Sequence, residues 1–359
     1  MKRILLFTFF ALWFAGTHAQ SLQVSTVPST GNNNTSQFAV GDEQITISNS
    51  SLAFNEGAVS ADIAHSGISA TLGETGISVF ETDGTKLINT DYDFVTDDSS
   101  LKIYAMGNGG FIVRENIANF LLYNSYGTIR HSVSNSSQST EGESISELAS
   151  DPAFKTVVLY NPKIVRNGQE GSRAQLVTMD GGTTDFYNSQ DRAIRMVNVT
   201  ENGQYINIVT YQTGTDDVVL IMDRFGNQLS EIPFDQNIAD VRVSNDGRFI
   251  TIRSNSRVAA HSVLSRERVG STSFRSTLHF AEYIPEDKTI IALTADKSGS
   301  VLSNIEFHAI NVAARAIERQ AFNSSLGTTD IIPVYLTREG RFNYSISGFS
   351  QKLNVKASF

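Results

Sequence analysis

The chain of 359 residues contains no cysteine. This absence excludes disulfides, thiolate metal sites and a lipid anchor on a cysteine side chain. Acidic residues outnumber basic ones, 37 to 28, and the net charge of −9 is spread along the chain. That charge favours solubility and disfavours Coulombic attraction to nucleic acid or an anionic bilayer. An ordinary hydrophobic core must therefore provide the stability.

Long apolar runs are also absent, except at the N-terminus. Lys2 and Arg3 precede thirteen mainly apolar residues, 4–16, and Thr17-His18-Ala19 places small residues at positions −3 and −1 of a cleavage site. Thirteen helical residues span about 20 Å, less than the ~30 Å core of a bilayer, which argues against a membrane anchor. Residues 1–19 are therefore predicted to be a signal peptide. We expect an exported bacterial protein that is periplasmic, outer-membrane-associated or extracellular.

Short runs of β-branched and alternating apolar residues are abundant. Examples are Tyr205–Val209, Val218–Ile221 and Phe249–Ile252. Turns that contain glycine or asparagine separate these runs, and few stretches have the apolar spacing of an amphipathic helix. The sequence therefore predicts an all-β protein.

The turns recur at a nearly constant interval. In one series the glycines are 43, 55, 44 and 44 residues apart, a further step of 44 reaches Ala314, and a polar insertion at 134–147 accounts for the long interval. This series reads Asp83-Gly84, Tyr126-Gly127, Gly181-Gly182, Phe225-Gly226 and Val269-Gly270. Glycine suits tight hairpins because their central residues take positive φ.

A second series of turns lies one hairpin earlier in each unit. It reads Asn108-Gly109-Gly110, Asn202-Gly203, Asn245-Asp246-Gly247, Glu286-Asp287 and Glu339-Gly340. Two hairpins per unit give three or four strands. A four-stranded unit of 40 to 45 residues has the size of a β-propeller blade, which buries its faces only against neighbouring blades.

We therefore predict a single β-propeller at 38–359 with seven four-stranded blades. The last blade is short by about one strand, so an N-terminal strand within 37–48 is expected to close the ring, after a flexible polar linker at 20–37. The blades are expected near 41–90, 91–133, 134–188, 189–234, 235–276, 277–322 and 323–359.

The hairpin at Val241–Ile252 resembles the V-x-x-S-x-D-G-x-x-(I/L) unit of bacterial WD40-like propellers, the broad family that includes TolB-like and YVTN-type repeats. The segments Val197–Ile206 and Tyr335–Phe342 are similar in outline. The chain lacks the proline-tryptophan signature of TolB repeats, and its one tryptophan is Trp13. The resemblance thus implies a propeller without a particular subfamily, and it brings no catalytic residue.

The sequence offers no motif for catalysis or for binding a cofactor or metal. A G-x-S-x-G nucleophile elbow is absent, and the histidines after the signal share no metal-ligand spacing. Asp91 and Asp93 begin like a calcium loop, but the later glycine and glutamate are missing. We therefore interpret Asp91, Asp93, Asp97 and Asp98 as a solvated loop and Asp216-Asp217 as a hairpin tip. The histidines in question are His65, His131, His261, His279 and His308.

These observations favour an exported, non-catalytic binding or assembly module that contacts another envelope protein or a glycan. One alternative is a secreted propeller enzyme that acts on carbohydrate through carboxylates near the axis, because sequence cannot test the distance between two such groups. At least three carboxylates or histidines converging at one mouth of the axis would favour the enzyme. A second alternative is an outer-membrane β-barrel, since Leu353, Val355 and Ala357 alternate before the terminal Phe359.

Overall fold

The structure is a computed structural model, and it describes most of the chain after the predicted signal peptide, which itself lies outside the described residues. In the described part the chain forms strands β1 to β31 and no helix. The described residues therefore contain no helix that is long and apolar enough to cross a membrane. The described residues are 21–27, 35–40, 43–48, 58–64, 68–73, 76–81, 85–92, 100–135, 145–166, 168–178, 182–299, 301–323, 325–327, 335–338, 343–348 and 351–358.

The described strands form separate antiparallel sheets, each made mainly of consecutive strands. The first three four-stranded sheets comprise β4 (Ala58–Ile63), β5 (Ser69–Gly73), β6 (Gly76–Phe80) and β7 (Lys86–Asp91); β8 (Lys102–Ala105), β9 (Phe111–Arg114), β10 (Asn119–Tyr123) and β11 (Ile129–Ser134); and β12 (Glu147–Ser150), β13 (Val157–Arg166), β14 (Gln169–Val177) and β15 (Thr183–Ser189).

The remaining sheets continue the same pattern. Two more have four strands, the next has a short fifth strand, β28, paired to β26, and the last four-stranded sheet joins both ends of the described chain. They comprise β16 (Ala193–Val199), β17 (Tyr205–Tyr211), β18 (Asp217–Asp223) and β19 (Gln228–Phe234); β20 (Asp240–Val243), β21 (Phe249–Arg253), β22 (Arg257–Ser262) and β23 (Arg268–Ser273); β24 (Leu278–Ile284), β25 (Thr289–Ser298), β26 (Val301–Asn311), β27 (Ala316–Phe322) and β28 (Leu326–Gly327); and β29 (Tyr335–Arg338), β30 (Asn343–Gly348), β31 (Gln351–Ser358) and β1 (Ser21–Val27).

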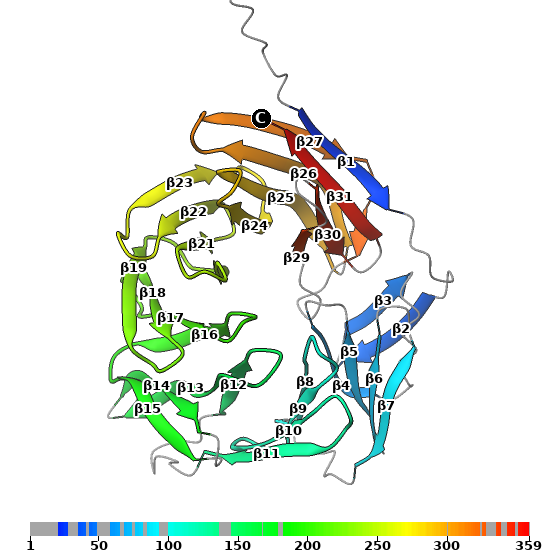
Figure 1. The fold of residues 1–359 in the computed structure, drawn as a ribbon, viewed down its shortest axis with the longest axis vertical. Helices are drawn as coiled ribbons and strands as arrows, with labels where there is room; N and C mark the ends of the chain where they lie inside the picture. Colours follow the sequence, from blue (N-terminus) through cyan, green and yellow to red (C-terminus); the bar gives the residue numbers. More distant parts are fainter. Residues whose placement is uncertain are drawn as a thin grey trace, which may run out of the picture.

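Figure 1 shows the sheets arranged around a common axis, with the first strand of each sheet nearest the axis and the fourth on the rim. The prediction of an all-β propeller built from four-stranded units is confirmed. Six of the described sheets have four strands and one has five. The predicted unit ends agree to within three residues with the ends of β7, β11, β15, β19, β23 and β27. From the second unit onward, the predicted starts lie up to 13 residues before the first strand of the unit, as at β12. The first unit begins later than expected, at β4 instead of residue 41.

The hydrophobic core lies between neighbouring sheets. Ile77 and Val79 of β6 pack with Ile103 of β8, and the same kind of apolar layer joins each described sheet to the next, up to the contact of β26 with β1. Inner strands are buried on both faces, which explains continuous runs such as β17, whereas the rim strand β19 alternates buried and exposed residues. The core is thus a series of layers around the axis.

The ring is closed by β1, which pairs with β31 over seven residues. The prediction that a strand within 37–48 closes the ring is therefore wrong, and so is the linker assignment for 21–27. The residues 35–48 form a separate hairpin, β2 (Thr35–Val40) with β3 (Glu43–Ser48). The physical reason is apolar packing: Leu22 and Val24 alternate toward the layer that contains Phe307, although their polar neighbours give the segment the composition of a linker.

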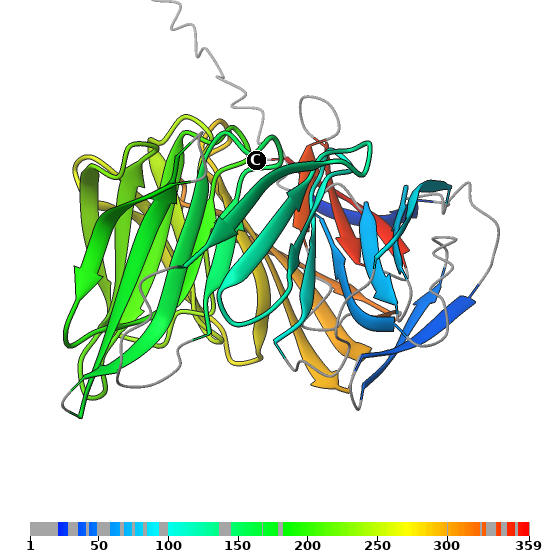
Figure 2. The same cartoon turned by 90° about the horizontal axis from the view of Figure 1, so that it is seen from below.

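Successive strands run in opposite directions, so the connections alternate between two faces of the ring. The turns between first and second strands and those between third and fourth strands lie on one face, which we call the turn face. The turns between second and third strands and the links from one sheet to the next lie on the other, which we call the connector face. Figure 2 shows the long β13–β14 and β25–β26 hairpins reaching toward the same side, as this topology requires.

The turn-face hairpins explain the repeated motif. In the β20–β21 turn the Ser244 hydroxyl donates to Asp246 (2.6 Å) and accepts from the Phe249 N–H (3.0 Å), and Gly247 has φ +69°. Thr200, Asn202 and Tyr205 repeat the arrangement in the preceding sheet. A hydroxyl, a carboxylate or amide and a glycine are thus what this turn requires.

Both predicted turn series are confirmed where the structure describes them, with one exception. Val269-Gly270 lies inside β23, and the turn occurs earlier, with Arg266 at φ +61°. Gly270 is needed for close packing instead, because a Cβ there would lie 2.3 Å from Val312 Cγ1. Gly84, Gly181 and Gly340 lie outside the described residues, as do 136–144 of the predicted insertion, which falls between β11 and β12.

Candidate functional site

The four described histidines lie on different strands and do not form a site. His308 is buried on β26, within 2.9 Å of Thr294 Oγ1 and packed on the Phe274 ring. His261 and His279 each have a ring nitrogen near a backbone carbonyl, and burial lowers the pKa of all three. His131 lies on the rim strand β11. His65 falls outside the described residues, so the scattered arrangement predicted for the histidines is seen for four of the five.

The acidic pair Asp216-Asp217 corrects a sequence prediction. Asp216 is exposed at the β17–β18 turn, but Asp217 is only 4% exposed. Its carboxylate accepts the Ile238 N–H (2.7 Å) and pairs with Arg195 (3.2 Å). Asp217 therefore joins this turn to the link between β19 and β20 and is not part of a solvated tip. Asp91 is exposed on β7, and Asp93, Asp97 and Asp98 lie outside the described residues.

Charged side chains, mostly from the innermost strands, form two groups near the axis. In the first, Glu147 of β12 accepts from Tyr104 of β8 (2.5 Å) and from Arg114 of β9 (2.7 Å), and Lys102 lies 3.7 Å away. Burial alone would raise the pKa of Glu147, but Lys102, Tyr104 and Arg114 outweigh it and lower that pKa. Glu147 is therefore an ionised anchor between two sheets.

The second group joins β20 to β24. Arg242 lies between Asp240 (3.1 Å) and Glu282 (3.3 Å). Burial raises the pKa of Glu282, whereas at Asp240 the nearby Arg242 and Arg253 outweigh burial and lower the pKa. The Glu282 side chain is nevertheless about a third exposed, at 32%.

The described axial carboxylates are held by arginines. Among the described residues, no three histidines or carboxylates come together in the manner of a metal site. Glu147, Asp240 and Glu282 each contact an arginine, and each arginine joins neighbouring elements. The geometry is that of ion pairs between sheets, in which opposite charges compensate the cost of burial. Chemically, such pairs fix the spacing of the blades.

The turn face is fixed by hydrogen bonds between successive sheets. Thr156 donates to the Gly203 carbonyl (2.7 Å), Asn202 to the Asn245 carbonyl (2.7 Å) and Tyr205 to the Asp246 carbonyl (3.2 Å). Asn202 and Asn245 are 43 residues apart, about one repeat length, so this bond joins equivalent turns of neighbouring sheets. This face is consequently regular and rigid.

The connector face is irregular. Strands β13, β14, β25 and β26 have 9 to 11 residues, whereas the other strands of their sheets have 7 or fewer, so two long hairpins extend from this face. Val165 and Val301, near the two tips, are 43% and 42% exposed. Between these hairpins around the ring, a hollow of about 360 Å³ is lined by Thr215, Asp216, Asp217, Asp235, Gln236 and Asn237. The face offers protruding apolar tips and a polar hollow on a rigid support.

Sequence reasoning missed the axial ion pairs and the long hairpins. Lys102, Tyr104 and Arg114 fall in one repeat, Glu147 in the next, and Arg242 and Glu282 in two others. Nothing in their local sequence pairs them across repeats. A signal existed for two of them, because Tyr104 and Glu147 are 43 residues apart, one repeat length. For the long hairpins, the signal was the number of residues between the two turn-face turns of one sheet. A longer connector-face hairpin lengthens that interval.

Comparisons with known proteins show no family for this chain. No family model matches the chain, and no curated protein is similar to it in sequence. A solved structure described as "Crystal Structure of Mitotic Checkpoint Complex" is similar over 100% of this chain and 99% of that one, with 13% sequence identity and a TM-score of 0.49. Likeness at this level does not bear on function.

Proposed function

We propose that this propeller is an exported, non-catalytic binding and assembly module of the bacterial envelope or cell surface. Its repeats resemble those of bacterial WD40-like propellers, and we propose as its ligand another envelope protein or a surface glycan. The connector face takes this ligand. The observation that carries the proposal is the pair of long hairpins, β13–β14 and β25–β26, on that face.

A rigid ring that carries extended hairpins on one face is a common basis for recognition. Binding residues concentrate on loops that a stable scaffold positions, because such loops vary without loss of the fold. The Lys163–Glu170 pair and the exposed Val165 give the β13–β14 tip both polar and apolar contacts. The polar hollow beside Asp216 adds hydrogen-bonding groups to the same face.

The experiment is affinity purification of the tagged chain from its native envelope, followed by mass spectrometry. Wild type is compared with a variant in which Val165→Ser and Glu170→Lys alter the hairpin tip. The matched control is Ile317→Ser, because Ile317 is 45% exposed and Val165 43%, but Ile317 lies on the other side of the ring. We expect a stoichiometric protein that the control retains and the tip variant loses.

A glycan array with the same three proteins separates the two ligand classes. Tip-dependent binding on the array, without a protein in the purification, identifies the ligand as a glycan. If wild type recovers neither, or if the tip variant and the control bind equally, the connector face is not the binding surface and the proposal fails.

A further inference from the structure

Exposed apolar side chains gather at one place on the molecule. Of ten large hydrophobic residues exposed in the described part of the chain, seven lie in the turn between the third and fourth strands or within two residues of the start of the fourth strand. Tyr126, Leu264 and Phe225 are the most exposed, at 88%, 80% and 67%. The seven are Leu87, Tyr126, Ile129, Phe225, Leu229, Leu264 and Ile317.

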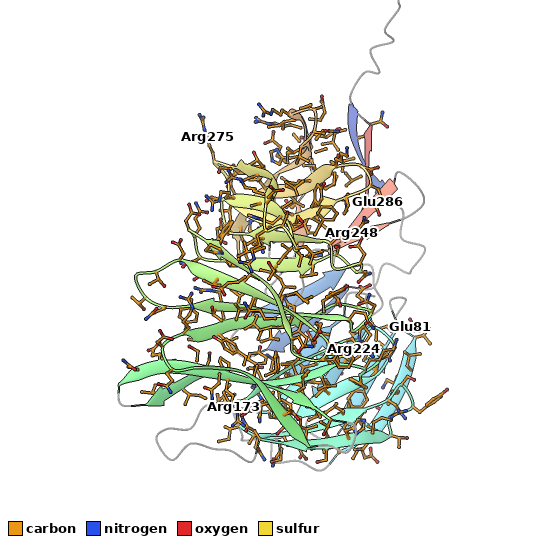
Figure 3. The ribbon with its side chains drawn as sticks, turned by 60° about the vertical axis from the view of Figure 1, so that its left-hand side comes forward. Glu81, Arg173, Arg224, Arg248, Arg275 and Glu286 are labelled. Atoms are coloured by element: carbon orange, nitrogen blue, oxygen red, sulfur yellow. The ribbon has the colours of Figure 1, made fainter. Side chains whose placement is uncertain are left out.

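These seven residues, which we call the apolar rim, come from five sheets. Each lies where the outermost hairpin of its sheet reaches the turn face. Equivalent positions in units related by rotation about one axis lie near one plane perpendicular to that axis. In Figure 3, Arg224 and Arg248 from this face lie on the side of the molecule away from Arg275, which belongs to the connector face. The apolar rim is therefore a flat set of tips, not one compact patch.

An exposed cation accompanies the apolar residue in each of the five sheets. Lys86 adjoins Leu87, Arg130 adjoins Ile129 and Arg224 adjoins Phe225. In the other two sheets, Arg266 and Arg315 lie two residues from Leu264 and Ile317. The Arg224 guanidinium stacks 4.6 Å from the Phe225 ring, so charge and apolar surface are presented together.

We infer that the apolar rim rests on a lipid bilayer, with its tips in the headgroup region and its cations on anionic lipid. A planar surface touches all five sheets at once, whereas a globular protein reaches only an arc of the ring. Aromatic and aliphatic tips beside Lys or Arg are the chemistry of interfacial binding. Each cation contributes to attraction near a negative surface, even though Glu81 and Glu267 on the same rim and the net charge of −9 oppose it.

The test is co-sedimentation of the chain from residue 20 onward, which contains every described strand, with vesicles. We expect binding to vesicles of phosphatidylethanolamine and phosphatidylglycerol, weaker binding to pure phosphatidylcholine, and loss at high salt. Replacing Tyr126, Phe225 and Leu264 together by serine should weaken binding at least about ten-fold. Replacing Arg130, Arg224 and Arg266 by glutamine should remove the preference for the anionic vesicles.

The control replaces Ile145, Val165 and Val301 by serine, because they are the three exposed large hydrophobic residues of the described chain that belong to the connector side. This control should bind vesicles within about two-fold of wild type, because those residues are not on the rim. The inference is overturned if wild type does not sediment with either vesicle, or if the control loses as much binding as the rim variant. It is also overturned if the rim variant loses a protein partner and wild type ignores lipid. Connector-face binding of the proposed ligand is scored separately, so either proposal can fail alone.

Discussion

The turn face and the connector face are built by the same chain in alternate turns, yet they differ in regularity. Turn-face hairpins keep the spacing of the repeat and bond to one another, as Asn202 does to Asn245 across 43 residues. Connector-face turns range from the short β21–β22 turn to the long β13–β14 hairpin. The repeat length is therefore constant at the turns that bond neighbouring sheets together. It varies on the connector face, where the turns can differ in length without loss of the fold.

The largest expected effect on stability concerns β1, which closes the ring on which both faces depend. Deleting 21–27 removes β1 from β31, and with it Leu22 and Val24, and exposes the rest of their layer, which includes Phe307 and Val355. We expect the free energy of unfolding to fall by more than about 4 kcal/mol, from lost apolar burial and an unpaired edge. Urea denaturation measures this effect. Deleting 35–48 instead removes a hairpin outside the four-stranded sheets and should cost much less; equal losses would contradict closure by β1.

The two faces can next be compared through one glycine from each. Gly247 on the turn face has φ +69°, and a Cβ there would lie 2.1 Å from the Tyr205 ring. Gly247→Ala should therefore destabilise the protein by about 3 kcal/mol, through strain and overpacking. Gly214 on the connector face has φ +83° but nothing within 4 Å. Gly214→Ala should cost only about 1 kcal/mol, the backbone term alone. Similar melting temperatures for the two variants would show that the faces are equally tolerant.

The fold was predictable because its signal is local and repeated. A glycine or asparagine at each turn and β-branched runs between turns identify the hairpins, and their spacing gives the unit. The closing strand was not predictable in the same way. Ser21–Val27 has only two apolar residues that alternate into the core, and its polar composition equally suits a linker.

The sequence predicted the general class of the candidate site but not the residues that form it. The glycine at 270 illustrates one failure, because a packing glycine and a turn glycine look alike in sequence. Asp217 illustrates another: its role depends on Arg195 and on the Ile238 N–H, which only the fold brings to it. Ion pairs between sheets carry no local pattern, whereas hairpins do.

Asp217 also marks a fixed point on the otherwise variable connector face. Asp217→Asn leaves the partly buried Arg195 without its counter-charge and should lower the free energy of unfolding by about 2 kcal/mol. Asp216→Asn next to it changes an exposed carboxylate and should alter stability by less than about 0.5 kcal/mol. Chemical denaturation of both variants sharpens the comparison, since it separates the part of this face that holds sheets together from the part that is free to bind.

The smallest predicted effect is a stabilisation, and it concerns a residue on the turn face. Arg266 has φ +61° at a position where the equivalent turns carry Gly127 and Gly226. Arg266→Gly relieves the left-handed strain, which exceeds the added chain entropy of glycine, so we expect stabilisation by about 0.5 kcal/mol. Arg268→Gly in β23 provides the control and should destabilise by about 1 kcal/mol, because glycine weakens a strand. If Arg266→Gly destabilises as well, its side chain supports the fold, and its presence on the apolar rim could no longer be attributed to lipid contact alone.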